Sequence, residues 1–378
     1  MSRVRIVDVA REAGVSLGTV SNALNHPERV RPDTRKLIEE TIDRLGYLPN
    51  QSARLLAGGT NKVLGLVLPC LTHGCSVQIV NGARNEALRH GYDLIVLCAN
   101  EDAEYEARYL RFLAGMQVAG ALVQPVGDVE RYEALGLPVH TVYLGVRDVP
   151  NDALSVTPDF EAQGSVVAEH VLSRGAQHVA VIGEPDVPMR AQRFEGVRSA
   201  LAVYEPERVE LILEGRSHGS IDGVRLGSML ARRDPAERPD AIIALSDVLA
   251  TGAIAGVQAA GCSVPDDIMV AGCDGNPLAW TGAVQLTTCS PAGYELGRKG
   301  VQLLIRTIEE AEEEQAVVHV RAQGALALQA GHRGRPAAHE VIRPFLLERA
   351  STGATSLTGE DFEGFPTGIP EYDIGSFL

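Results

Sequence analysis

Polar side chains suited to DNA recognition gather in a short segment near the amino terminus, over residues 16–25. Asn22 can form two hydrogen bonds with the edge of an adenine, and the side chain of Leu17 can contact a thymine methyl group. Short hydroxyl side chains are suited to phosphate contacts, and the segment holds Ser16, Thr19 and Ser21. On a helix over 17–25, the expected exposed positions are Leu17, Gly18, Ser21, Asn22 and Asn25. A three-helix module that binds protein is the alternative that these residues alone leave open.

A second pattern with potential chemistry is the run Gly215-Arg-Ser-His-Gly219, which matches the Gly-x-Ser-x-Gly motif of α/β hydrolases. Ser217 would be the nucleophile, between an expected strand and an expected helix. An acid and a base must follow in the chain. The residues in that order are Asp274 and then His319, His332 or His339. Small residues are also common in loops between strands and helices, so the match can arise by chance.

The elements that position the DNA-suited side chains are three short helices, expected over residues 6–13, 17–25 and 32–45. Gly14 separates the first two helices, and Ser16 is suited to cap the amino end of the second. Pro32 suits the first turn of the third helix, and Gly46 suits the position after its last turn. This spacing is typical of a helix-turn-helix, which places its second helix in the major groove.

After a linker over residues 49–60, short apolar runs alternate with amphipathic segments. Strands are expected over 63–68, 93–98, 120–124, 139–143, 178–182, 210–213, 241–244 and 268–271. Helices are expected over 77–90, 103–114, 160–173, 193–203, 221–232 and 247–260. The alternation favours parallel sheets, in one large sheet or two smaller ones. The acidic run Glu309–Glu314 indicates a solvated helix end.

The charge balance excludes a protein that coats a polyanion with its whole surface, because 34 Lys and Arg stand against 49 Asp and Glu. A local basic module is compatible with this total, since residues 1–60 hold nine Lys and Arg against seven Asp and Glu. The sequence has no apolar run of membrane-spanning length and no signal-peptide pattern. Its six cysteines form no Cys-x-x-Cys pair, and dinucleotide, Walker and zinc-protease motifs are missing. We therefore expect a cytoplasmic protein that uses no metal, cofactor or membrane.

Residues 6–25, Ile-Val-Asp-Val-Ala-Arg-Glu-Ala-Gly-Val-Ser-Leu-Gly-Thr-Val-Ser-Asn-Ala-Leu-Asn, resemble the DNA-binding head of the LacI/GalR (lactose/galactose repressor) family. The likeness continues through Leu45-Gly-Tyr-Leu-Pro-Asn50 and reaches the family's hinge helix at Ala53-Arg-Leu-Leu56. A looser likeness, which includes Arg193-Phe-Glu-Gly196, covers most of the chain up to residue 351. The resemblance implies a small all-α helix-turn-helix head and an α/β effector domain. That domain would have the type I periplasmic-binding-protein-like fold, with two parallel-sheet subdomains.

Composition and the resemblance together indicate how the chain is divided. The expected regions are a helix-turn-helix domain over 1–48, a hinge helix or linker over 49–60, an effector-binding and dimerisation domain over 61–351, and a disordered acidic tail over 352–378. Within the effector domain, the expected subdomains are roughly 61–158 plus 290–325, and 159–289 plus 326–351. The stretch 310–341 is longer than in the family, and its role is open.

For DNA binding, the resemblance places Leu17, Gly18 and Asn22 at base-contacting positions. Leu56 would enter the minor groove at the operator centre, where an apolar wedge unstacks a base step. Arg5 stands where the family usually has a Ser or Thr helix cap. Because arginine cannot accept N–H bonds, we expect it to contact phosphate at some loss of helix stability. The expected DNA-binding residues are Arg5, Ser16, Leu17, Gly18, Thr19, Ser21, Asn22, Asn25, Tyr47, Asn50, Arg54 and Leu56.

For ligand binding, the resemblance places Arg193 and Asp274 at the cleft between the subdomains, the usual place for a small ligand. A guanidinium suits carboxylates or neighbouring hydroxyls, and a carboxylate can accept from sugar hydroxyls. Asp247 precedes an expected helix, where capping is an equally supported role. Ser217 stands where some relatives have an aromatic residue, which disfavours a planar base as ligand. His73 follows the first strand and completes the expected effector site.

The sequence thus predicts a transcriptional repressor that is not an enzyme. It would bind a pseudo-palindromic operator in double-stranded DNA as a homodimer. A small-molecule effector, most often a sugar or sugar derivative in this family, would control operator affinity by changing the closure of the two subdomains. A hydrolase that acts through Ser217 and a solute-binding protein are the alternatives.

Overall fold

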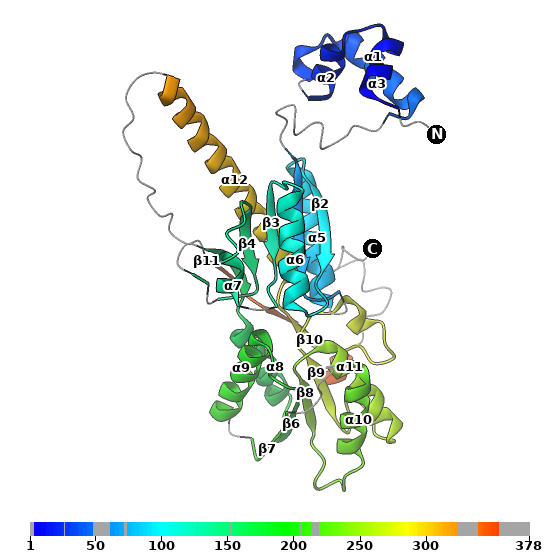
Figure 1. Cartoon of the computed structure of the whole chain (residues 1–378). Coiled ribbons are helices and arrows are strands. Elements are labelled where there is room, and N and C mark those ends of the chain that lie inside the picture. Colours follow the sequence, from blue (N-terminus) through cyan, green and yellow to red (C-terminus); the bar gives the residue numbers. More distant parts are fainter. Residues whose placement is uncertain are drawn as a thin grey trace. The chain divides into compact units, whose positions relative to one another are not determined.

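The computed structural model describes most of the chain in two compact units, Met1–Lys62 and Val63–Leu378 (Figure 1). The described residues are 4–25, 27–47, 61–71, 74–126, 128–147, 149–150, 153–204, 206–213, 219–323 and 339–354. Within these ranges, no helix has the length and apolar character needed to cross a membrane.

The first unit contains the three helices that the sequence predicts, with the same bounds. They are α1 (Ile6–Ala13), α2 (Leu17–Asn25) and α3 (Pro32–Leu45), with a short 3-10 turn, η1 (Pro27–Arg29), before α3. Val9, Val20 and Ile38 are fully buried and form the centre of a small apolar core. A unit of this size buries a smaller share of its surface than a large domain does, so these few side chains carry much of its stability.

Local contacts at the helix ends explain why these bounds were predictable. Gly14 and Gly46 end α1 and α3 in the left-handed conformation, with φ of 66° and 63°. The Ser16 hydroxyl accepts the Thr19 N–H at 3.0 Å, so Ser16 caps α2 as expected. At α1, the Asp8 carboxylate accepts the Arg5 N–H at 2.9 Å. The chain therefore keeps one half of a capping box where the Arg5 side chain cannot serve.

The second unit contains two six-stranded sheets, which confirms the expected pair of parallel-sheet subdomains. The first sheet comprises β1 (Val63–Leu68), β2 (Asp93–Cys98), β3 (Gly120–Val123), β4 (His140–Leu144), β5 (Leu154–Pro158) and β11 (His339–Ile342). The second comprises β6 (His178–Ile182), β7 (Arg208–Ile212), β8 (Ala241–Ala244), β9 (Met269–Gly272), β10 (Thr287–Ser290) and β12 (Phe345–Leu347). The strand orders are β11-β5-β4-β3-β1-β2 and β12-β10-β9-β8-β6-β7. Neighbouring strands are parallel throughout except for the antiparallel pair β10 and β12.

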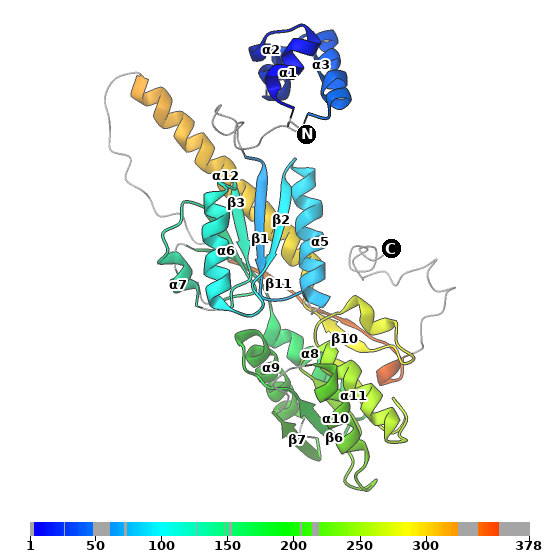
Figure 2. The ribbon, with the colours of Figure 1, turned by 45° about the vertical axis from the view of Figure 1, so that its right-hand side comes forward.

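The second unit has two lobes, and each lobe is one sheet with helices on both faces (Figure 2). In the first lobe, α5 (Gly74–Arg89) and α12 (Gly293–Gln323) pack on one face of the sheet. On the other face lie α6 (Ala103–Gly115) and α7 (Val129–Glu133). In the second lobe, one face is covered by α8 (Phe160–Ser173) and α9 (Pro188–Tyr204), and the other by α10 (Ser220–Ala231) and α11 (Asp247–Ala259). Two 3-10 turns, η2 (Pro277–Trp280) and η3 (Ala350–Thr352), complete the lobe.

The expected assignment of residues 326–351 to the second subdomain is wrong for β11. This strand pairs in parallel with β5, at the edge of the first sheet, whereas β12 joins the second sheet as expected. The expected helix end at Glu309–Glu314 is also wrong, because α12 continues to Gln323. Neither Gly nor Pro interrupts the sequence between Glu309 and Gln323, so no helix-breaking residue ends the helix at the acidic run.

The second lobe also extends further than expected at its carboxyl end. Thr352, which the sequence places in the acidic tail, is 2% exposed. Its hydroxyl bonds His170 Nε2 at 2.8 Å and the Thr287 hydroxyl at 2.7 Å. The rest of the expected tail, 355–378, and the expected hinge over 49–60 lie outside the described residues.

A buried carboxyl group in the first lobe gives a testable pH dependence of stability. Glu106 of α6 is fully buried, and its Oε2 accepts the Val126 N–H at 2.7 Å. Burial raises the pKa of Glu106 from 4.5 to about 7. Because the folded-state pKa is the higher one, the group favours folding most below pH 4.5, and this contribution disappears as pH rises to about 7.

Glu106→Gln keeps an acceptor for the Val126 amide and removes this titration. Between pH 5 and pH 8, we expect the variant to gain about 2–3 kcal/mol of unfolding free energy relative to the parent protein. Chemical denaturation at the two pH values measures the change. The same difference between the two proteins at both pH values would contradict the assignment.

Candidate functional site

The DNA-suited side chains of the first unit lie on the outer face of α2. Val20 turns inward and is fully buried, whereas Leu17 is 48% exposed. Gly18 and Asn22 are exposed as well, on the same side of the helix. This arrangement leaves the amino-terminal part of α2 free to enter a groove, as a recognition helix must.

Hydroxyl groups at the amino end of α2 are partly committed to the protein itself. The Ser16 and Thr19 hydroxyls bond one another at 2.8 Å. Ser16 and Arg5 are exposed, and Thr19 and Ser21 are half-buried. A Cβ at Gly18 would meet nothing closer than the Ser16 hydroxyl at 3.8 Å, so space exists for a side chain that the sequence does not use.

Tyr47 lies in the apolar core of the first unit and is 9% exposed. Its ring therefore has a structural role, and little of it is available to DNA. The remaining expected DNA contacts, Asn50, Arg54 and Leu56, lie outside the described residues, as does the side chain of Asn25.

The second candidate site is a buried cluster of charges at the carboxyl ends of strands in the second lobe. α9 crosses α8 at glycines, because a Cβ on Gly164 would lie 1.9 Å from the Arg193 carbonyl oxygen. A Cβ on Gly196 would lie equally close to the Glu161 carbonyl oxygen. This close crossing explains the spacing Arg-x-x-Gly and holds Arg193 beside Gln163 of α8.

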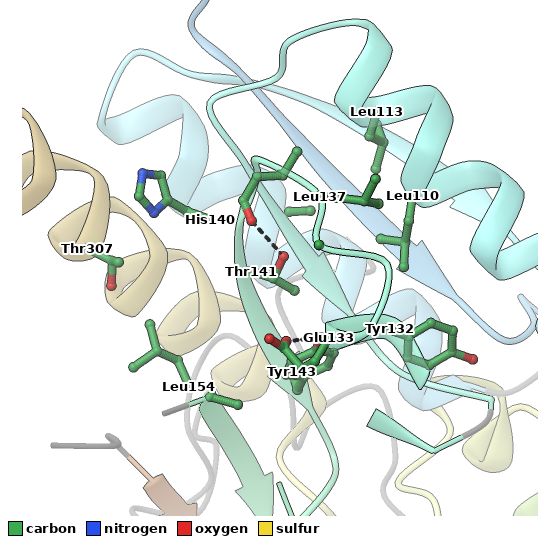
Figure 3. A pocket seen from close by; sticks show the side chains of 14 residues that line it. Leu110, Leu113, Tyr132, Glu133, Leu137, His140, Thr141, Tyr143, Leu154 and Thr307 are labelled. Carbon is green, nitrogen blue, oxygen red and sulfur yellow. Dashed lines mark hydrogen bonds between the residues drawn. The ribbon is translucent and has the colours of Figure 1, made fainter. Parts of the chain in front are cut away.

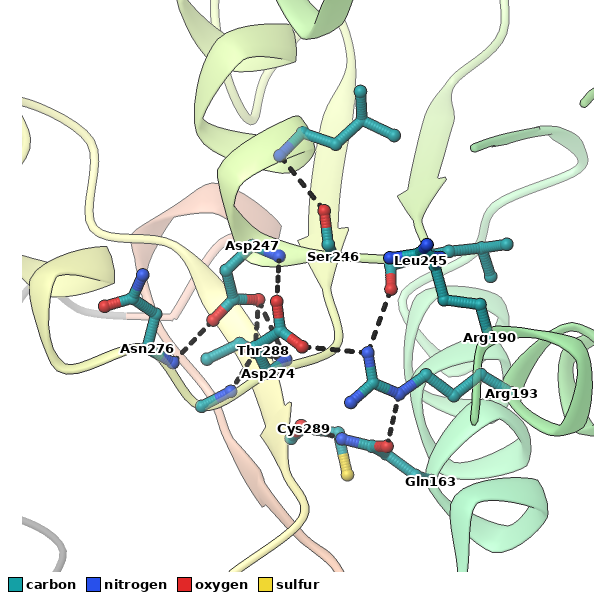
Figure 4. A network of polar contacts seen from close by, with 12 residues as sticks. Gln163, Arg190, Arg193, Leu245, Ser246, Asp247, Asp274, Asn276, Thr288 and Cys289 are labelled. Carbon is teal, nitrogen blue, oxygen red and sulfur yellow. Dashed lines mark hydrogen bonds and ion pairs between the residues drawn. The ribbon is translucent and has the colours of Figure 1, made fainter. Parts of the chain in front are cut away.

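Arg193 is the centre of the cluster (Figure 4). Its Nη1 lies 2.8 Å from Asp274 Oδ1 and donates to the Leu245 carbonyl at 3.1 Å. Its Nε donates to Gln163 Oε1 at 2.7 Å, and its guanidinium lies 5.4 Å from the ring centroid of Phe160. Arg193 is fully buried, yet Nη2 has no hydrogen-bond partner in the described part of the chain. A buried N–H without an acceptor costs free energy, so Nη2 is suited to bind an acceptor atom of a ligand.

Asp247 lies just after β8 and forms hydrogen bonds with the loop that follows β9. It accepts the Thr288 hydroxyl at 2.6 Å, the Asn276 N–H at 2.7 Å and the Asp274 N–H at 3.2 Å. In return, Asp274 Oδ2 accepts the Asp247 N–H at 3.0 Å. Ser246 caps α11 by accepting the Leu249 N–H, so the alternative role of Asp247 as that helix's cap is wrong.

The cluster holds one guanidinium and two carboxyl groups away from water. Burial and the neighbouring Asp274 charge raise the pKa of Asp247 to about 7. Burial alone would lower the pKa of Arg193, but Asp274 outweighs it and the pKa is raised. Arg193 therefore stays charged.

The cluster lies where the two lobes meet. Gln78 of α5 donates from Nε2 to the Gly275 carbonyl of the second lobe at 2.9 Å. At the start of α5, a Cβ on Gly74 would lie 2.6 Å from the Asn276 Cα. The loop Asp274–Asn276 thus touches the Arg193 cluster on one side and the first lobe on the other.

The structure brings together three of the residues that the sequence singles out: Arg193, Asp274 and Asp247. Ser217 and His73 lie outside the described residues. Sequence reasoning missed Gln163, Thr288 and Asn276. Gln163 offers a signal in retrospect, because it is one of two polar residues, with His170, on the mainly apolar buried stripe of α8.

The hydrolase alternative finds no support among the described residues. Asp274 is held by Arg193, and His339 Nδ1 bonds the Ser155 hydroxyl at 2.8 Å in the first sheet. A catalytic acid and base must lie within hydrogen-bond reach of each other, and these two belong to different lobes.

Comparisons with known proteins agree with this architecture. Residues 5–50 match the family of bacterial regulatory proteins called the lacI family, and residues 168–327 match a periplasmic binding protein-like domain. The catabolite control protein A of Priestia megaterium is 30% identical over 322 residues, which cover 84% of this chain and 96% of that protein. The lac repressor dimer bound to operator and the anti-inducer ONPF superposes with a TM-score of 0.73 at 22% identity, covering 93% of this chain and 100% of that one. A LacI-family regulator from Enterococcus faecium with bound ribose gives 0.61 at 21% identity, covering 79% and 100%.

Proposed function

The chain belongs to the LacI family of bacterial regulatory proteins and is a DNA-binding transcriptional regulator. We propose that a sugar-like effector controls its affinity for an operator. The first unit contacts DNA, and the second unit binds the effector between its lobes. The protein works as a homodimer on a pseudo-palindromic site, where two copies of α2 contact two half-sites.

The Arg193 cluster is the observation that carries this proposal. It lies at the carboxyl ends of parallel strands, where open α/β folds bind their ligands, and next to the contact between the lobes. The buried Nη2 of Arg193 is suited to a ligand oxygen, and Asp274 is suited to a hydroxyl donor. A sugar presents both kinds of group, and a family member holds ribose.

The coupling to DNA runs through the lobes. The first unit is joined to the first lobe at Val63, the first residue of β1. A ligand that binds one arrangement of the lobes more tightly shifts the protein toward that arrangement, and only by its difference in affinity. The change in lobe contact at Gln78 and Gly275 then alters the spacing of the two DNA-binding units in the dimer.

In-vitro selection of duplex DNA by the full chain, with and without a pool of sugars, tests this function. We expect a pseudo-palindromic site to be enriched and one sugar to change its recovery. The selection is run at low salt, where phosphate contacts are strongest. If no site is enriched under that condition, the proposal is contradicted.

Asn22 gives the sharpest test of the DNA surface. Asn22→Ala should cost about 1–3 kcal/mol of operator binding at one base pair of each half-site and relax the preference there. Glu40→Ala, at an exposed position of α3, is the matched control and should leave the preference unchanged. Binding to operators substituted at each position measures both variants. An unchanged base preference in Asn22→Ala would rule out its contact with the base.

A further inference from the structure

The first lobe contains a hollow that is remote from the Arg193 cluster. It has a volume of about 270 Å³ and lies at the amino ends of β4 and β5, among side chains of α6, α7 and α12 (Figure 3). The Arg193 cluster lies at the carboxyl ends of strands in the other sheet, and the two sites share no residue.

The register of two strands leaves this space open. Leu154, the first residue of β5, pairs with Val142. His140 and Thr141 of β4 therefore extend beyond the amino end of β5. The neighbouring helix α7 is only five residues long, so it covers little of the sheet here.

One wall of the hollow is apolar and another offers hydroxyl oxygens. Leu110 and Leu113 of α6 and Leu137 after α7 form the apolar wall. Thr141 donates to the Val139 carbonyl at 3.1 Å, and Thr307 donates to the Leu303 carbonyl at 2.9 Å. Because both hydroxyl hydrogens are used in this way, the two oxygens can only accept hydrogen bonds from a ligand.

The charge of the hollow is set by Glu133 at the end of α7. Its lining contains this one carboxylate and no Lys or Arg. Glu133 Oε1 accepts the hydroxyl of Tyr143, which is 2% exposed, at 2.5 Å. Among the described residues, no basic side chain lies within ion-pair distance of Glu133. The carboxylate is thus oriented by a fixed tyrosine while its negative charge is unpaired.

We propose that this hollow binds a small organic cation, a protonated amine attached to an apolar body. The ammonium group donates to Glu133 and to the Thr141 oxygen, and the apolar body lies against the leucines. A carboxylate or phosphate ligand is disfavoured, because it would meet the Glu133 carboxylate in a lining that holds no Lys or Arg. The inference does not depend on the effector proposed for the Arg193 cluster.

Titration calorimetry on the full chain tests the proposal with three probes that share one ring and differ in charge: 2-phenylethylamine, 2-phenylethanol and 3-phenylpropionate. We expect the amine to bind about tenfold more tightly than the alcohol, because a hydrogen bond to a charged group is the stronger one. The carboxylate should bind least.

Three variants locate the binding. Glu133→Gln keeps an acceptor for Tyr143 and removes the charge, so the amine should lose its advantage over the alcohol. Glu130→Gln, at an exposed glutamate of the same helix that does not line the hollow, is the matched control and should change nothing. Thr307→Phe fills the hollow and should weaken both ligands by about tenfold.

Failure of the amine to bind would overturn the proposal. So would binding that Glu133→Gln leaves unchanged, because the charge would then play no part. Amine binding that added ribose displaces would place the site at the lobe contact instead. If circular dichroism shows that Thr307→Phe does not fold, the comparison of Glu133→Gln with Glu130→Gln decides the matter.

Discussion

Replacing Ile38 by alanine is expected to abolish operator binding while the two-lobed unit stays folded. Ile38 is fully buried in the core of the first unit. Truncation of a buried isoleucine costs about 2–5 kcal/mol, a large part of what a unit of about 60 residues can hold in reserve. The recognition face of α2 exists only when this core packs, so loss of the core removes the DNA surface.

The neighbouring residue supplies the control. Leu37 is 46% exposed, and Leu37→Ala should change stability by less than about 0.5 kcal/mol. Fluorescence anisotropy with operator DNA measures binding, and calorimetry follows the melting of the larger unit. If Ile38→Ala binds operator like the parent protein, the helical core does not position the DNA surface.

Replacing Arg193 by methionine is expected to destabilise the two-lobed unit by about 3–5 kcal/mol and to remove the response to effector. Methionine fills much of the space but leaves Asp274 buried without its cation. Removal of one partner from a buried pair is costly for this reason. The bonds to Gln163 and to the Leu245 carbonyl disappear as well.

Arg198 on the same helix is the matched control. Its ion pair with Glu195 is on the surface, with side chains 57% and 46% exposed, and Arg198→Met should cost less than about 1 kcal/mol. The double variant Arg193→Met with Asp274→Asn should recover part of the loss, because position 274 then no longer carries a buried charge without its cation. Thermal unfolding measures all three variants. Equal melting of Arg193→Met and Arg198→Met would contradict the central place given to Arg193.

The first unit was predictable because its signals are local. Gly14, Ser16, Pro32 and Gly46 each act within one or two residues of a helix end, and the structure uses all four as expected. The bond from the Arg5 N–H to the Asp8 carboxylate was also predictable, since Asp8 stands three residues after Arg5. The burial of Tyr47 was not, because it depends on how the three helices pack.

In the second unit, what escaped prediction depends on long-range contacts. β11 pairs with β5 across more than 180 residues of chain, from His339 to Ser155, and no local pattern specifies the sheet edge that an added strand will join. Asp247 was expected at the right place, but its partners come from other parts of the chain, Thr288 from β10 and Asn276 from the loop after β9. The hollow beside Glu133 depends on the register between β4 and β5, which cannot be predicted from the local sequence.

The central claim is that one chain joins a DNA-binding surface to a ligand site that controls it. The most direct measurement is the affinity of the full chain for its selected operator, by fluorescence anisotropy, with and without the sugar recovered from the pool. We expect that sugar to change the affinity by roughly 5- to 150-fold and Arg193→Lys, which lacks the planar fork, to lose the change. A sugar that binds the protein but leaves operator affinity unaltered would contradict the claim.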